Sequence, residues 1–140
     1  MFWRRRFYRS PITNVQAGEE KRVLYHKGTI LIKQLVLRYD GNDDTGTTNC
    51  VWTIKVDSEE ILRESIRNIH VYFSGGRVRL DSDAPVVCVD YNDTYKVYTF
   101  IIRNLGLVKE GIEIWFKNED TSNQCGVRIG IVYDVYEEGK

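Results

Sequence analysis

The cysteine and histidine side chains are the groups in this sequence whose types could support catalysis or metal binding. A cysteine beside a histidine can act as a nucleophilic thiolate, and four such side chains can hold zinc, usually as closely spaced pairs. No two of the five stand close together in the sequence: His26, Cys50, His70, Cys88 and Cys125. We therefore predict no catalytic residues, no metal site and no cofactor. Each cysteine lies within or beside an apolar run, which indicates a buried free thiol, with one disulfide as the alternative.

The acidic segment 40–49 carries oxygen ligands in a spacing similar to that of a calcium-binding loop, at Asp40, Asn42 and Asp44. Such a loop requires glycine at its sixth position and glutamate at its twelfth. This chain has Thr45 and Val51 at those positions. Its glycine, asparagine, aspartate and threonine content predicts a long turn between two strands instead.

Alternating apolar residues predict the elements around these groups. Segment 28–41 has apolar side chains at both odd and even positions, which is typical of a long central strand covered on both faces. Further alternating runs predict strands at 50–57, 69–73, 77–81, 85–91, 95–103, 111–118 and 125–136. The runs at 69–73 and 77–81 flank Ser74, Gly75 and Gly76, and this predicts a hairpin.

One segment breaks the alternation. Ile61, Leu62 and Ile66 are spaced as on one face of a helix, and Asp57 followed by Glu60 resembles a capping box. A short helix near 58–67 is therefore predicted. About eight strands and one helix predict an all-β fold, an antiparallel two-sheet sandwich with jelly-roll-like connections, in a chain whose 140 residues suit a single core.

The first ten residues form a basic and aromatic arm, in a chain whose 20 basic and 20 acidic residues otherwise balance. The arm carries four positive charges, so residues 11–140 carry a net charge of −4. We predict an arm and linker at 1–20 and a β-sandwich domain at 21–140. The predicted interface residues of the arm are Phe2, Trp3, Arg4, Arg5, Arg6, Phe7, Tyr8 and Arg9.

Aromatic residues and arginine are the residue types that most often anchor protein interfaces. We therefore expect the aromatic side chains to fill pockets on a partner and the arginines to pair with the acidic body of neighbouring copies. A disordered solubilising tail is one alternative for the arm. Another is electrostatic contact with nucleic acid or an anionic membrane, since arginine also pairs with phosphate.

The whole pattern resembles one family of proteins. A basic arm, the strand GTILIKQLVLRYD, the segment D-S-E-E-I-L-x-x-S at 57–65 and the closing pair within 113–139 are similar to small β-sandwich or single jelly-roll structural proteins of tailless double-stranded DNA viruses, archaeal ones included. Such proteins build shells, vertices or spikes, with arms that bridge subunits or face an internal membrane or genome. The resemblance implies a non-enzymatic capsid subunit in the virion, which associates with copies of itself and with other coat proteins.

A carbohydrate- or ligand-binding β-sandwich module is the alternative function. It is favoured by the aromatic content and by polar loops at 40–49 and 118–124, although Trp52 and Trp115 are expected in the core or an interface. If the protein acts as a structural subunit, we expect no small-molecule substrate. The start lacks the apolar run of a signal peptide, and no segment reaches the ~18 apolar residues that span a bilayer, so a cytoplasmic location is expected outside a virion.

Overall fold

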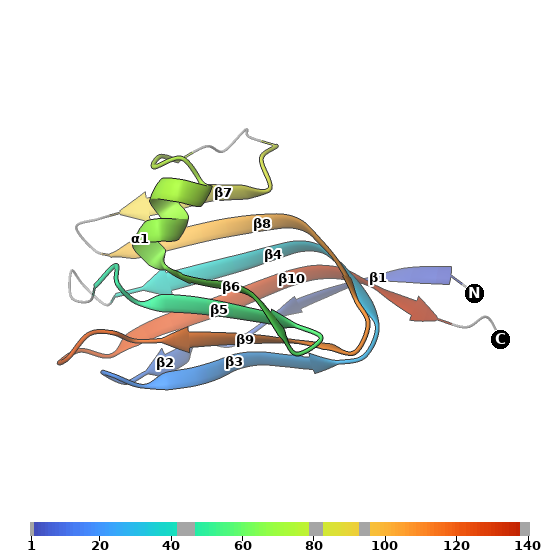
Figure 1. The fold of residues 1–140 in the computed structure, drawn as a ribbon, viewed down its shortest axis with the longest axis horizontal. Helices are drawn as coiled ribbons and strands as arrows, with labels where there is room; N and C mark the ends of the chain where they lie inside the picture. The colour runs from blue at the N-terminus through green and yellow to red at the C-terminus, as the bar shows by residue number, and fades with distance from the viewer. Residues whose placement is uncertain (1, 42–46, 79–82, 93–95, 138–140) are drawn as a thin grey trace.

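The computed structural model describes residues 2–41, 47–78, 83–92 and 96–137, which form two antiparallel sheets packed face to face (Figure 1). The six-stranded sheet contains β1 (Phe2–Arg9), β10 (Cys125–Glu137), β4 (Ile30–Asp40), β8 (Val97–Val108) and β7 (Val86–Asn92) in that order, with β2 (Thr13–Val15) also on β10. The four-stranded sheet has the order β3 (Glu20–Lys27), β9 (Gly111–Lys117), β5 (Val51–Val56) and β6 (Glu59–Ser65). The predicted all-β sandwich is confirmed, with ten strands where about eight were expected.

The strands pair as nested hairpins. The innermost pair is β5 with β6, followed outward by β4 with β8, β3 with β9, and β2 with β10. Successive pairs lie alternately in the two sheets, so one long hairpin is rolled around the core. This order of pairs, alternating between the two sheets, is the one found in jelly rolls.

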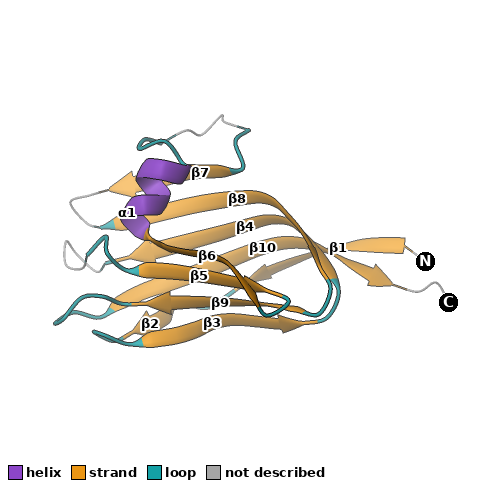
Figure 2. Ribbon diagram, viewed as in Figure 1, coloured by secondary structure: helices purple, strands orange, loops and turns teal. Residues whose placement is uncertain are grey.

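Strand β4 is central in the six-stranded sheet, as predicted, but only one of its faces is fully buried. Its core-facing side chains are Ile30, Ile32, Leu35, Leu37 and Tyr39. The opposite face, which carries Leu31 and Val36, is half-buried because none of the described elements forms a layer over that side of the sheet (Figure 2). The apolar residues at odd and even positions of this strand therefore lie on two different faces, one buried in the core and one partly exposed.

The prediction of a helix near 58–67 is wrong for most of its length. Asp57 and Ser58 have left-handed φ angles of 52° and 67°, and they reverse the chain so that 59–65 pairs with β5 as strand β6. The helix starts only after this strand, as α1 (Ile66–Asn68) and a following π-helical turn, η1 (Ile69–Phe73). Its N-terminal cap is Ser65, whose Oγ accepts a hydrogen bond from the backbone N–H of Asn68 at 3.1 Å.

The predicted hairpin at 69–81 is also wrong in its first arm. Residues 69–73 are helical, with Ile69 and His70 buried and the next three side chains exposed. A short apolar run fits a buried helical turn as well as a strand, so periodicity alone does not separate the two. The expected turn is present, with left-handed Gly75 and Gly76. Residues 79–82, and 42–46 of the predicted long turn, lie outside the described residues.

Asp57 connects two turns at one end of the sandwich. Its carboxylate accepts hydrogen bonds from the backbone N–H groups of Lys109, Glu110 and Gly111, at 2.7 Å for Glu110. These bonds, that of Glu110 first, hold the pKa of Asp57 below its ordinary value of 3.8. The carboxylate thus ties the β5–β6 turn to the β8–β9 turn rather than capping a helix.

We expect Asp57→Ala to lower the thermal unfolding midpoint by a few degrees, because alanine accepts none of the three hydrogen bonds and disfavours a left-handed φ. Asp57→Asn is the matched control, since asparagine tolerates that backbone and keeps one carbonyl oxygen. The unfolded chain takes up a proton before the folded chain does, so the wild-type contribution is present above pH 3.8 and lost as pH falls below it. Thermal melts of the wild type and of both variants against pH measure this. A difference in melting midpoint between the wild type and Asp57→Ala that does not shrink as pH falls below 3.8 would contradict it.

No helix in the part of the chain that the structure describes is long and apolar enough to cross a membrane.

Candidate interaction surfaces

The predicted arm is a strand on the sheet of its own chain. Residues 2–9 form β1, which pairs antiparallel with the second half of β10, from Phe2 opposite Glu137 to Arg9 opposite Gly130. No other strand of the described sheet pairs with β1, so β1 is an edge strand with one side of its backbone turned outward. All eight predicted interface residues are therefore presented along one sheet edge.

Three contacts hold β1 and the residue after it in place. Arg5 donates two side-chain hydrogen bonds to Asp134, a carboxylate that is nearly buried. The rings of Trp3 and Tyr136 lie 5.1 Å apart. Beyond the strand, buried Ser10 exchanges two hydrogen bonds with the backbone of Ile129, both at 2.8 Å. The fold therefore includes Ser10, and the ion pair of Arg5, the ring contact of Trp3 and the backbone ladder with β10 all hold β1.

We expect Asp134→Asn to loosen β1 selectively. The hydrogen bond from Arg5 is the main reason that the pKa of Asp134 is low, so asparagine loses a charge-assisted bond. Amide hydrogen exchange in 2–9 should become roughly two- to five-fold faster while that of β4 is unchanged. Asp134 is easier to protonate when β1 is detached, so protonation favours the detached state. In the wild type, exchange in 2–9 should therefore also become faster as pH falls below 3.8. An equal increase in exchange rate along the whole chain would contradict a local role of Asp134 in holding β1.

The aromatic side chains of β1 remain largely on the surface although the strand is ordered. Successive residues alternate between the two faces, so Trp3, Arg5, Phe7 and Arg9 lie on the outer face of the sheet. Phe7 is 76 % exposed and lies opposite half-buried Val132. Apolar area of this kind, next to guanidinium groups, has the composition of an interface core. The sequence identified these residues by composition, although it did not predict that they form a strand.

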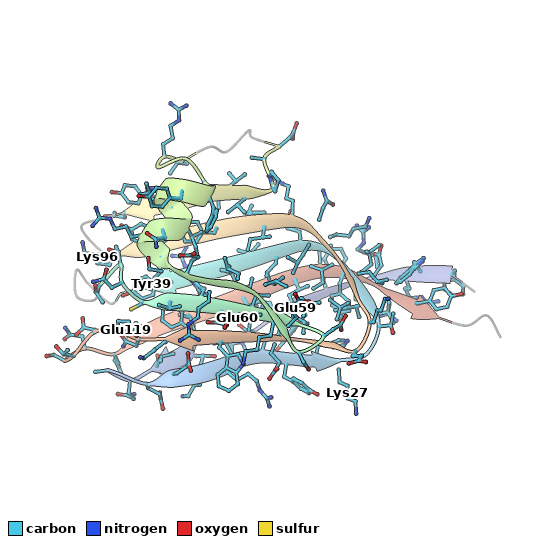
Figure 3. The ribbon with its side chains drawn as sticks, in the orientation of Figure 1. Lys27, Tyr39, Glu59, Glu60, Lys96 and Glu119 are labelled. Carbon is cyan, nitrogen blue, oxygen red and sulfur yellow. The ribbon has the colours of Figure 1, made fainter. Side chains whose placement is uncertain are left out.

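A second surface lies on the opposite sheet and was not predicted. Strand β6 is the edge of the four-stranded sheet and carries Glu59, Glu60 and Glu64 against a single arginine; Figure 3 labels the first two. Beside it is an apolar groove of about 230 Å³, lined by Ile54, Ile61, Leu62, Ile69, Phe73, Val86, Ile102 and Leu105. Ile61 at its rim is 46 % exposed. Sequence reasoning missed this surface because it assigned 58–67 to a helix.

A third surface is an aromatic pocket of about 280 Å³ beside helix α1. It is lined by Thr48, Arg67, His70, Val71, Tyr91 and Tyr98. The rings of His70 and Tyr91 are stacked, with centroids 4.6 Å apart and planes 11° apart, and Tyr98 meets Tyr91 edge-on at 5.1 Å. Tyr91 is 42 % exposed, so part of its side chain is open to solvent beside this pocket.

The thiols are buried, as predicted. All three cysteines are free and buried, and burial raises the pKa of Cys88 to about 11 and that of Cys125 to about 12. Trp52 is in the core, also as predicted. Trp115, expected in the core or an interface, is half-buried and not part of the core. The cations of Arg22 and Lys55 lie near its ring, at 6.0 and 5.6 Å. Among the described residues, no three histidine, cysteine or acidic side chains are grouped as metal ligands would be.

No protein-family model matches the chain, and no curated protein matches it significantly. The function proposed below therefore rests on these three surfaces.

Proposed function

We propose that this protein is a non-enzymatic structural subunit that assembles with copies of itself, as the capsid subunit of a virion and in contact with other coat proteins. Strand β1 is the single observation that supports it most. This strand places four arginines and four aromatic residues on a sheet edge, with Phe7 76 % exposed. Ordered, exposed aromatic area beside arginine is what a specific protein interface requires.

The edge position of β1 strengthens the proposal. An edge strand offers unpaired backbone N–H and C=O groups to another chain, and proteins that stay monomeric usually block such edges with charge, proline or a covering loop. The arginines of β1 disfavour pairing with any basic surface, but they attract an acidic one. The strand therefore selects its partner by charge. The body of this chain, with a net charge of −4 over residues 11–140, has the required sign.

The fold is compatible with the capsid proposal and does not decide it. Jelly rolls occur in viral capsid proteins and also in lectins, and one fold can host unrelated functions. The viral assignment rests on the resemblance of the arm, the long β4 strand and the closing β9–β10 pair to coat proteins of tailless viruses. Self-assembly rests on the surface of β1.

Light scattering of the purified chain tests self-assembly. We expect the full-length protein to form a large particle, and we expect a variant lacking residues 2–9 to be a folded monomer. The deletion ends before Ser10 because that buried residue bonds to the backbone of Ile129 and belongs to the fold. A far-ultraviolet circular dichroism spectrum confirms that the truncated chain is folded. A full-length chain that stays monomeric at high protein concentration would overturn the proposal.

The aromatic pocket beside α1 supports a second candidate function, binding of a carbohydrate. Stacked His70 and Tyr91, with Arg67 and Thr48 as hydrogen-bonding groups at the rim, have the apolar face and polar edge that a sugar ring uses. A glycan array should then give binding that is lost in Tyr91→Ala. Tyr72→Ala is the control, since Tyr72 is 77 % exposed and does not line this pocket. Absence of any glycan binding would remove this candidate.

A further inference from the structure

We infer that the acidic edge strand β6, with the apolar groove beside it, binds strand β1 of a second copy of this chain. The inference rests on the proposed function, because it names the two surfaces through which copies would assemble. It names the site that binds β1 and makes the contact between copies head-to-tail. Neither follows from the composition of the arm.

Charge distinguishes β6 from the other edges of the described sheets. Strand β6 has a net charge of −2, whereas β3, the opposite edge of the same sheet, has a net charge of +2 from Glu20, Lys21, Arg22 and Lys27. Strand β7 has one acidic residue, and Val78 bridges to Cys88 along it. Strand β1 has a formal charge of +4 in eight residues, of which Asp134 offsets the charge of Arg5. The strand stays basic, so β6 is the edge that attracts it most strongly.

The same charges disfavour pairing of like edges. Two β1 strands would bring eight arginines together, and two β6 strands would bring six glutamates together. Like charges across a strand pair are destabilising. A symmetric dimer through either edge is therefore disfavoured, and the pairing of β1 with β6 remains.

Backbone and length are also compatible. Strand β1 has eight residues and β6 has seven, and each lies at an edge of its sheet. Pairing their outward backbone groups would join the six-stranded sheet of one copy to the four-stranded sheet of the next, as in recognition by strand addition.

The groove gives the aromatic side chains of β1 a place to be buried. Its lining is almost entirely apolar, and two of its residues, Ile61 and Phe73, are about half exposed in the single chain. Phe7 is one of the most exposed side chains on the surface of β1. Burial of such a ring in an apolar pocket surrounded by charge pairs is the usual arrangement of an interface hot spot.

Because the two surfaces differ, the contact is head-to-tail. Each copy gives β1 to one neighbour and receives β1 from another at β6. Repetition of such a contact produces a closed ring when the rotation closes and an open chain when it does not. This is consistent with a subunit that builds a larger assembly.

Charge reversal tests the pairing. Glu59→Lys with Glu60→Lys should weaken self-association at least about ten-fold, because attraction is replaced by repulsion. The matched control is Glu20→Lys with Glu119→Lys, two exposed glutamates on β3 and after β9, which changes the net charge equally away from β6. This control should assemble as the wild type does. Thermal melts confirm that all variants are folded.

Rescue makes the test specific. Arg4→Glu with Arg9→Glu should also abolish assembly, and the chain carrying all four changes should regain it, because the two charges are exchanged between β1 and β6. Arg5 is left unchanged, since it bonds to Asp134 within its own chain. Arg4 also has a contact within its chain, with the ring of Phe2, so a thermal melt of Arg4→Glu/Arg9→Glu checks that this variant is folded. Association is measured by light scattering and sedimentation. Wild-type assembly in Glu59→Lys/Glu60→Lys would overturn this interface alone, whereas a monomeric wild type would overturn the proposed function itself.

Discussion

Replacement of Phe116 by alanine is expected to lower the free energy of unfolding by about 3–5 kcal/mol, the largest single effect we predict. Phe116 is fully buried on β9, where its ring meets Trp52 of β5 edge-on at 4.6 Å. It also stacks on Tyr39 of β4 in the facing sheet, with ring centroids 5.6 Å apart. The substitution would therefore open a cavity at the contact between the two sheets. Chemical denaturation followed by tryptophan fluorescence measures this effect.

Phe116→Leu is the control for this prediction. Leucine keeps most of the apolar volume and loses only the ring contacts, so a smaller loss, of roughly 1–2 kcal/mol, is expected. Equal losses for the two variants would show that the ring, rather than the filled volume, accounts for the stability.

The second large effect is expected at Asn118, which is completely buried at the end of β9. Its side-chain amide donates to the carbonyl oxygens of Val15 and Asn123, at 3.0 and 2.8 Å, and its oxygen accepts from the N–H of Asp120. Asn118→Ala removes this partner from all three backbone groups, and the bond to the carbonyl oxygen of Val15 is fully buried. We expect it to lower the free energy of unfolding by about 2–3 kcal/mol.

Because Val15 belongs to β2, the same substitution should also release the start of the chain. Limited proteolysis should then cut within 10–20 faster than in the wild type. Gln124→Ala is the control, since the Gln124 side chain is exposed and its bond with Gln16 lies at the surface. This substitution should change the free energy of unfolding by no more than about 0.5 kcal/mol. If Asn118→Ala lowers the stability but leaves the rate of cleavage within 10–20 unchanged, Asn118 does not anchor β2.

The central strands could be predicted from sequence because their alternation is set by burial. Strands β4 and β9, and residues 127–132 of β10, alternate for most of their length between a buried and a partly exposed face. Period-two alternation requires only that one face meets the core. The sandwich class followed from the number and spacing of such runs.

Strand β6 could not be predicted because its sequence favours another structure locally. EEILRES contains good helix formers and apolar residues at helical spacing. The deciding feature is the left-handed turn at Asp57 and Ser58, without glycine, which brings 59–65 alongside β5. Pairing with β5 and hydrogen bonds from the β8–β9 turn overrode the local preference.

The interaction surfaces were partly accessible from the sequence. Composition alone identified residues 2–9, because four arginines and four aromatics in one short segment are unusual at any position. Their conformation depends on β10, and the ion pair between Arg5 and Asp134 joins residues 129 positions apart. No local pattern contains such a contact. The groove beside β6 is lined by side chains from five elements, so no local pattern predicts it either.

The pairing of β1 with β10 also determines when the protein can finish folding. The two strands come from opposite ends of the described chain, whose ends lie close together in Figure 1. During synthesis, residues 2–9 emerge long before 125–137, so β1 must wait for its partner strand. A chain dominated by such distant pairings folds slowly, typically in milliseconds to seconds. The edge that β1 forms therefore exists only after residues 125–137 have been made and have paired with it.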